Sequence, residues 1–186
     1  MKVLKFGGTS VGTVESLRNV KAIVESQTEP VIVVVSALGG ITDQLINTAK
    51  LAAKGDISHL ESYARIVERH REVIKGIVPE ALQMDVLSIV NPILEELGNI
   101  YRGVSLIKDL SDRTLDIIVS YGERLSSVII SRIINGAIHF DSRNFIKTEK
   151  RWNKHVLDNE TTQKLIHEVF DTVDFKVALV PGFISS

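Results

Sequence analysis

The sequence predicts an α/β protein in which a mainly parallel sheet is sandwiched by helices, with a long helical insertion. A strand, a helix and a second strand follow one another between residues 2 and 36, which is the order of a βαβ unit. The second strand, VIVVVS at 31–36, is a continuous β-branched run, typical of a strand buried on both faces of a parallel sheet. The insertion is indicated by helical apolar spacing through most of residues 42–135.

The first unit is predicted as a strand at 2–6, a helix from Thr13 to about Gln27, and the strand at 31–36. The helix follows from the spacing of its apolar residues, Val14, Leu17, Val20, Ile23 and Val24.

The same spacing predicts three helices in the insertion, over 42–54, 57–75 and 80–102. Pro92 is expected to break or kink the third of them, because proline removes a backbone donor. Ser111 is expected to cap a fourth helix, DRTLDIIVSYGERLSSVIISRIIN, which Gly122 is expected to interrupt near its middle.

The last third of the chain is predicted to add strands at 138–142 and 176–182, with a helix at 159–171 between them. The stretch KTEKRWNKH is expected to be an exposed basic loop. We also expect the strand at 176–182 to leave an apolar sheet edge that further strands would cover, and the isolated chain therefore to self-associate.

Composition excludes several classes of protein. The chain has 186 residues, enough for one domain or part of a larger one, and its 22 basic and 23 acidic residues imply no general attraction to nucleic acid or membranes. The absence of cysteine excludes disulfides and thiolate chemistry and suits a reducing cytoplasm. Lys2 and Lys5 interrupt the first apolar residues, so no signal peptide fits, and no apolar run reaches the ~20 residues of a membrane span.

Three predicted strands end in small or polar turns: GGTS, SALGG and PGFISS. In open α/β sheets ligands bind at the carboxyl ends of the strands, so we expect these three turns to form one site. The first follows Lys5 and contains Gly7, Gly8, Thr9 and Ser10. It matches neither the P-loop nor the dinucleotide fingerprint, and it is either a phosphate-facing turn or a tight turn beside an exposed lysine.

The second turn adds Ser36, Gly39, Gly40 and Thr42, whose hydroxyls and amides favour the phosphate interpretation, although Thr42 or Asp43 also suits a helix N-cap. Glu123 has two interpretations: a surface residue paired with Arg124, which the residues alone favour, or a carboxylate at a helix break that holds an ammonium group. The five histidines have no metal-ligand spacing, so no metal site is predicted.

Taken together, KVLKFGGTSVG, VIVVVSALGGITD, VSYGERLSS, FDSR and LVPGFISS resemble the aspartate kinases of the amino-acid-kinase superfamily, in order and spacing over essentially the whole chain. The segment YRGVSLIKDLSDRTLDIIVSYGERLS is most similar to the kinase part of bifunctional aspartokinase–homoserine dehydrogenases. The resemblance implies the carbamate-kinase-like fold of that superfamily. It also implies ATP-dependent phosphorylation of the L-aspartate side chain to 4-phospho-L-aspartate, the first step toward lysine, threonine and methionine.

The resemblance also assigns roles. Lys5 would contact the transferring phosphate, with Gly7, Gly8, Thr9 and Ser10 in the adjoining turn and Mg²⁺ bound through the phosphates of ATP. The substrate-binding residues implied are Ser36, Gly39, Gly40, Thr42, Glu123 and Phe183. Glu123 would accept the substrate ammonium group, which reverses the preference for a surface role.

The family pattern continues after GFI with a Gly-Arg-Gly-Gly-Ser-Asp segment, an adenine-binding half and regulatory ACT domains, none of which lies in residues 1–186. The chain thus resembles an N-terminal, amino-acid-binding lobe, an incomplete domain inactive by itself and expected to form homo-oligomers in its full-length protein. Two alternatives are another carboxylate kinase of the superfamily, such as a glutamate or acetylglutamate kinase, and a non-catalytic binding or oligomerisation module. The Gly122-Glu123 segment and the long insertion count against the first.

Overall fold

The computed structural model describes residues 2–151, 154–182 and 184. A four-stranded sheet lies at its centre, in the order β1-β2-β6-β3, and all its neighbouring strands are parallel. The strands are β1 (Lys2–Phe6), β2 (Val31–Val35), β3 (Ala137–His139) and β6 (Val177–Pro181). The predicted α/β class is confirmed.

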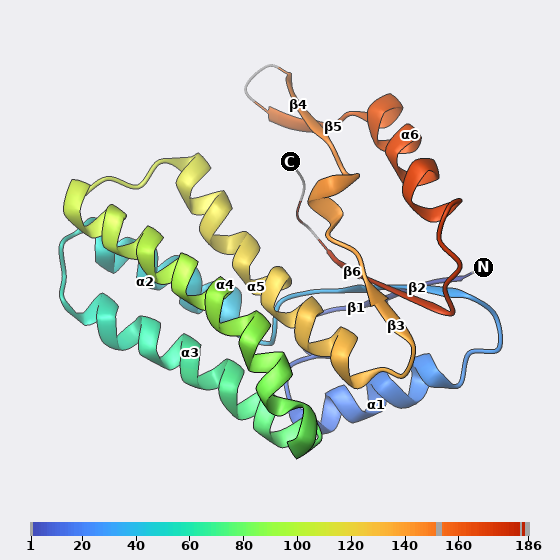
Figure 1. The fold of residues 1–186 in the computed structure, drawn as a ribbon. Helices are drawn as coiled ribbons and strands as arrows, with labels where there is room; N and C mark the ends of the chain where they lie inside the picture. Colours follow the sequence, from blue (N-terminus) through green and yellow to red (C-terminus); the bar gives the residue numbers. More distant parts are fainter. Residues whose placement is uncertain (1, 152–153, 183, 185–186) are drawn as a thin grey trace.

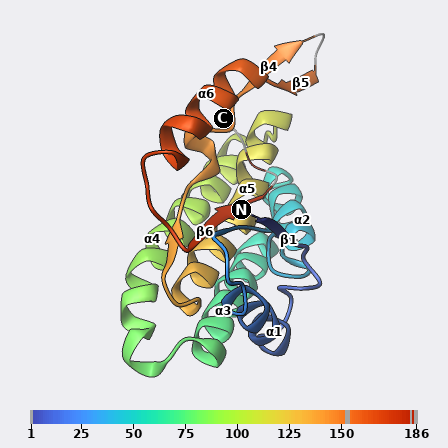
Figure 2. The ribbon, with the colours of Figure 1, turned by 90° about the vertical axis from the view of Figure 1, so that its right-hand side faces the viewer.

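Helices cover the sheet on both faces (Figures 1 and 2). The chain crosses the sheet in one direction from β1 to β2 and on to β3, and then turns back to place β6 between β2 and β3. Because parallel crossovers are right-handed, helices α1 (Val14–Glu25) and α5 (Asp112–Ile133) lie on one face and α6 (Asn159–Phe170) lies on the other.

The insertion forms a helical layer of α2 (Ile41–Ala53), α3 (Ser58–Ile77) and α4 (Glu80–Ile107) beside α5. Its buried apolar residues are continuous with those under the sheet, including Leu45, Ile66, Leu97 and Ile129. The Tyr101 hydroxyl donates to the Leu45 carbonyl across this layer (3.1 Å), so α4 is tied to α2 by a buried hydrogen bond.

Two predicted breaks in helices are wrong. Helix α4 continues through Pro92 to Ile107, so Pro92 does not end it, and a kink there stays a prediction. Helix α5 runs unbroken through Gly122, with the predicted Ser111 cap accepting from the Thr114 N–H. The predicted N-cap at Thr42 or Asp43 is also wrong, because α2 begins at Ile41 behind Gly40, whose φ is +80°. The close packing of α5 on Ala37, described below, explains why a glycine occupies position 122 inside this helix.

The basic stretch after residue 146 is not a loop. It contains strands β4 (Thr148–Arg151) and β5 (Lys154–Leu157), which pair antiparallel as a separate two-stranded sheet. A short 3-10 helix, Ser142–Asn144, precedes them.

Strand β6 lies between β2 and β3, so it is not the exposed edge that we expected. Chain order does not reveal spatial order, and the edges are β1 and β3, where Val3 is 64% and Ile138 is 39% exposed. The predicted self-association therefore loses its premise and stays untested. Among the described residues, no helix is long and apolar enough to cross a membrane.

Candidate active site

The carboxyl ends of β1, β2 and β6 meet at one edge of the sheet. The Ser36 N–H donates to the Phe6 carbonyl (3.1 Å), and the Gly182 N–H donates to the Val35 carbonyl (2.8 Å), so the strand ladder continues into the turns. These turns and one face of α5 enclose a pocket of about 400 Å³, which we call the strand-end pocket. Seven predicted site residues line it: Lys5, Gly8, Ser36, Gly39, Gly40, Thr42 and Glu123.

The turn after β1 is tight. The Ser10 and Val11 N–H groups donate to the Gly7 carbonyl at 2.9 and 3.3 Å. Gly7, Thr9 and Ser10 belong to this turn without lining the pocket, whereas Lys5 and Gly8 do line it. Phe183, the remaining predicted site residue, lies outside the described residues.

The turn after β2 packs directly on the turn after β1. A Cβ on Gly39 would lie 3.1 Å from both the Gly12 Cα and the Gly8 carbonyl oxygen, so a larger residue would push the two turns apart by a few tenths of an ångström. In the described part of the chain, the N–H groups of Gly8, Gly39 and Gly40 donate to no protein acceptor. Two glycine turns thus bring free amides to the pocket beside Lys5, an arrangement that suits an anion.

Glu123 reaches the pocket from α5. Its side chain is 6% exposed, and within the described residues its Oε2 atom is buried without a hydrogen-bond partner. Burial raises the pKa of Glu123, and hydrogen bonding to the Ala37 backbone opposes that rise. A buried carboxylate with an unused oxygen in a polar pocket is a receptor for a cationic group.

The helix carries Glu123 close to the loop because Gly122 has no side chain. A Cβ at Gly122 would lie 2.7 Å from the Ala37 Cβ. One turn later the buried Ser126 hydroxyl donates to the Ser36 carbonyl (2.7 Å) and fixes the helix against the end of β2.

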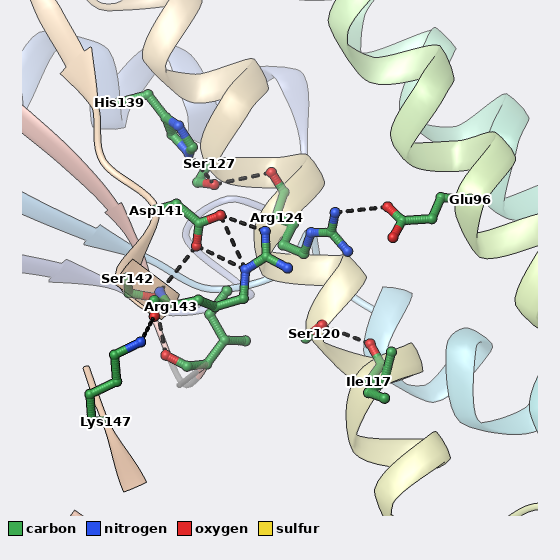
Figure 3. Close-up of polar contacts among 11 residues, drawn as sticks. Glu96, Ile117, Ser120, Arg124, Ser127, His139, Asp141, Ser142, Arg143 and Lys147 are labelled. Carbon is green, nitrogen blue, oxygen red and sulfur yellow. Dashed lines mark hydrogen bonds and ion pairs between the residues drawn. The ribbon is translucent and has the colours of Figure 1, made fainter. Parts of the chain in front are cut away.

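The alternative in which Glu123 pairs with Arg124 is wrong. Arg124 pairs with Glu96 of α4 at 3.0 Å (Figure 3). Its guanidinium lies 4.2 Å from the centroid of the Tyr121 ring. Arg124 therefore points toward the helical layer, leaving the Glu123 carboxyl to the pocket.

Sequence reasoning missed the polar network that begins at the end of β3 (Figure 3). Asp141 accepts from the Arg143 side chain, and these hydrogen bonds lower the pKa of Asp141 although burial opposes them. The Ser142 hydroxyl donates to the Ile184 carbonyl (3.0 Å), which ties this segment to the turn after β6. The FDSR motif contained these residues, but nothing in its pattern indicated their partners.

In the parts that the structure describes, no group of three or more histidine or acidic residues could hold a metal ion. The donor set of the strand-end pocket, a lysine with free backbone amides, fits phosphate oxygens better than a bare cation.

The sequence model of the amino acid kinase family matches residues 1–186. The chain belongs to the amino acid kinase family. Within the family it resembles aspartokinases, as predicted: it is 30% identical over 194 residues to aspartokinase 1 of Arabidopsis thaliana, covering 98% of this chain and 33% of that protein. A bifunctional aspartokinase/homoserine dehydrogenase of Buchnera aphidicola is 28% identical, covering 100% of this chain and 24% of its own length.

Solved structures of this family share the fold. E. coli aspartokinase III, crystallised with aspartate and ADP, superposes with a TM-score of 0.87 at 24% identity, covering 100% of this chain and 41% of that one. The same enzyme with lysine and aspartate gives a TM-score of 0.85. The chain spans about a third of the first of its curated relatives.

Proposed function

We propose that this chain provides the amino-acid-binding lobe of an aspartate kinase, which transfers the γ-phosphoryl group of ATP to the side-chain carboxylate of L-aspartate. The observation that carries the proposal is the meeting of Lys5 and Glu123 in the strand-end pocket, which glycines with free amides also line. A cation and a buried carboxylate in one polar pocket suit an amino acid that receives a phosphoryl group. The aspartokinase relatives support aspartate as that amino acid.

Each lining residue then has a chemical task. Glu123, which lines the pocket, accepts the substrate ammonium group with its carboxylate, which offsets the cost of burying that carboxylate. Ser36 and Thr42 offer hydroxyls to the substrate carboxylates, and the amides of Gly39 and Gly40 lie beside them. Lys5 and the Gly8 amide face the transferred phosphate and disperse its charge.

The reaction needs no general base, since the acceptor carboxylate is already ionised and nucleophilic. Positioning and charge neutralisation are the main contributions of a protein to phosphoryl transfer. Mg²⁺ bound to the nucleotide phosphates would supply further neutralisation.

We also propose that residues outside 1–186 present the nucleotide, because this chain spans only a third of its aspartokinase 1 relative. The isolated chain should therefore bind L-aspartate without turning over ATP. A cytoplasmic location and a homo-oligomeric state stay predictions from the sequence.

Binding and transfer are tested separately. Calorimetry on residues 1–186 should detect L-aspartate, with binding lost in Glu123→Gln and retained in Lys5→Met. In the longest natural open reading frame that contains the chain, hydroxamate formation from aspartate and ATP should be lost in both variants. Transfer by the isolated chain would contradict the proposed division of labour.

Two other results would contradict the function itself. Preferential use of L-glutamate or acetylglutamate by the longer protein would replace aspartate kinase with the related carboxylate kinase. Unchanged turnover in both Lys5→Met and Glu123→Gln would favour a non-catalytic module.

A further inference from the structure

A second cavity, of about 500 Å³, lies between α3 and α4 in the helical layer and shares no lining residue with the strand-end pocket. We call it the α3–α4 groove. Its two walls are neighbouring helices joined by a short turn (Figure 1). The residues that carry the argument all line it: His59, Tyr63 and Arg71 from α3, and Glu95, Gly98, Tyr101 and Arg102 from α4.

The floor of the groove is aromatic. The Tyr63 and Tyr101 rings meet edge to face, with centroids 5.9 Å apart. Both hydroxyls are already used, because Tyr63 donates to the Leu94 carbonyl (2.7 Å) and Tyr101 donates to the Leu45 carbonyl. A Cβ on Gly98 would lie 2.9 Å from the Tyr63 ring, so this glycine lets the ring lie against α4. The half-buried Tyr63 ring therefore offers its carbons to the groove, with the buried Tyr101 ring packed behind it, and such a surface favours a flat apolar group.

One end of the groove is cationic. Tyr63 packs on Gly98, so in this helical hairpin His59, one turn before Tyr63, and Arg102, one turn after Gly98, lie at the same end. Arg102 is exposed and makes no ion pair or hydrogen bond with another described residue. It is therefore available to an anionic ligand.

His59 adds a buried polar atom to this end. Its side chain is 6% exposed, and Nδ1 lies 2.7 Å from the Asp56 carbonyl, to which it donates. Its Nε2 atom has no partner among the described residues and is not among their fully buried unpartnered atoms, so it keeps some access to solvent in a residue that lines the groove. With Nδ1 donating, Nε2 of the neutral ring is an acceptor, so it can accept from a protonated phosphate oxygen.

The opposite end has mixed charge. Arg71 and Glu95 both line the groove there. Their charges have opposite effects on the pKa of Tyr63: Arg71 lowers it and Glu95 raises it. Arg71 is twelve positions after His59 on α3, which corresponds to about 18 Å along the helix. A ligand of one ring therefore reaches only one end, and the His59 end suits an anion.

We propose that the α3–α4 groove binds a small organic anion, in which a flat ring rests on Tyr63 and a phosphate or carboxylate group is held by Arg102 beside His59. The volume lies within the range of about 300–1,000 Å³ common for small-molecule sites. Because the groove and the strand-end pocket share no residue, this site is independent of the aspartate kinase proposal.

The test titrates the chain with phenyl phosphate, benzoate or inorganic phosphate. Binding of each probe is measured by the ¹⁵N chemical shifts of the backbone amides. Phenyl phosphate or benzoate should shift the Tyr63 and Gly98 amides, and inorganic phosphate should bind about tenfold more weakly because it lacks the ring. Arg102→Gln should weaken ring-anion binding about tenfold or more, as expected for loss of a charged hydrogen bond. Saturating L-aspartate should not displace the probe.

The matched control is Arg113→Gln, which removes the same charge from an exposed arginine at the start of α5 that does not line the groove. It should leave probe binding unchanged, and both variants should keep the wild-type melting temperature. Four results would overturn the site: no shifts in the groove, equal effects of the two variants, inorganic phosphate binding as tightly as phenyl phosphate, or displacement by L-aspartate.

Discussion

Gly122 of α5 lies against Ala37 of the turn after β2, so closely that a Cβ at Gly122 would come 2.7 Å from the Ala37 Cβ. The next residue along α5 is Glu123, and the residue before Ala37 is Ser36, and both line the strand-end pocket. The contact between two small residues thus sets how near the buried carboxylate comes to the strand ends.

Gly122→Ala should therefore destabilise the protein, although alanine is the better helix former. Overpacking of a core costs about 1–3 kcal/mol, against a propensity gain of about 1 kcal/mol. We expect the free energy of unfolding, measured in urea, to fall by up to about 2 kcal/mol. L-Aspartate binding should also weaken, because the turn after β2 must move to make room for the added methyl group.

Gly103→Ala is the control for this variant. Gly103 lies in α4, and a Cβ added there would meet no other atom within 4 Å, so only propensity acts and stability should rise by up to about 1 kcal/mol. Equal stabilisation by both substitutions would show that the Ala37 contact places no constraint on α5.

Glu123→Gln should stabilise the ligand-free chain at neutral pH. Burial raises the folded-state pKa of Glu123 above its ordinary value of 4.5, so the ionised form opposes folding. In the wild type the resulting loss of folding stability develops as the pH rises above about 4.5 and is complete above the folded-state pKa of Glu123. The gain in melting temperature from Glu123→Gln should therefore be present at pH 7 and shrink on acidification toward pH 4.5. A lower melting temperature of the variant at pH 7 would contradict this sign.

The strand-end pocket was predictable because a general rule places ligands at the carboxyl ends of parallel strands, and the turns there are rich in glycine and hydroxyl groups. The role of Glu123 was not readable from local pattern. Its burial depends on contacts between α5 and the turn after β2, which are far apart in sequence, as the Ser126–Ser36 pair illustrates with a separation of 90.

The failures of sequence reasoning have similar causes. Gly122 was interpreted as a helix break because helix propensity considers each residue alone. It does not include the close contact with Ala37, which leaves no room for a side chain at position 122. The β4–β5 hairpin was missed because TEKR and KHVL lack a clear alternation of apolar and polar residues. The central place of β6 follows from spatial order, which adjacent segments of sequence do not determine.

His70→Leu should remove a loss of stability in acid. His70 is fully buried, and desolvation lowers its pKa to about 4, so the neutral ring is the folded form. Its stabilising contribution is present above the ordinary pKa of 6.5 and is lost as the pH falls from there toward about 4. At pH 5 the wild type should have lost about 2 kcal/mol through this residue, from about 1.4 kcal/mol per pH unit.

The leucine variant should keep its neutral-pH stability. The Nδ1 atom of His70 bonds only within its own helix, to the Ile66 carbonyl, and Nε2 is buried without a partner in the described structure. Urea unfolding at pH 7, 6 and 5 tests both statements. A variant that loses stability on acidification as steeply as the wild type would place the acid sensitivity elsewhere.

Ser126→Ala should lower stability and loosen the acceptor side of the pocket. The Ser126 side chain is fully buried and its hydroxyl donates to the partly buried Ser36 carbonyl at 2.7 Å, so its removal leaves that carbonyl with one hydrogen bond fewer. Such losses cost about 1–3 kcal/mol, or about 2–4 °C of melting temperature per kcal/mol for a chain of this size.

Ser88→Ala is the matched control, because the Ser88 hydroxyl donates to the Asp85 carbonyl on an exposed turn of α4. This substitution should shift the melting temperature by less than about 1 °C. L-Aspartate affinity should fall only in Ser126→Ala, since only that substitution frees the end of β2 from α5. Equal melting temperatures of the two variants would mean that the Ser126–Ser36 bond does not hold the helix to the sheet.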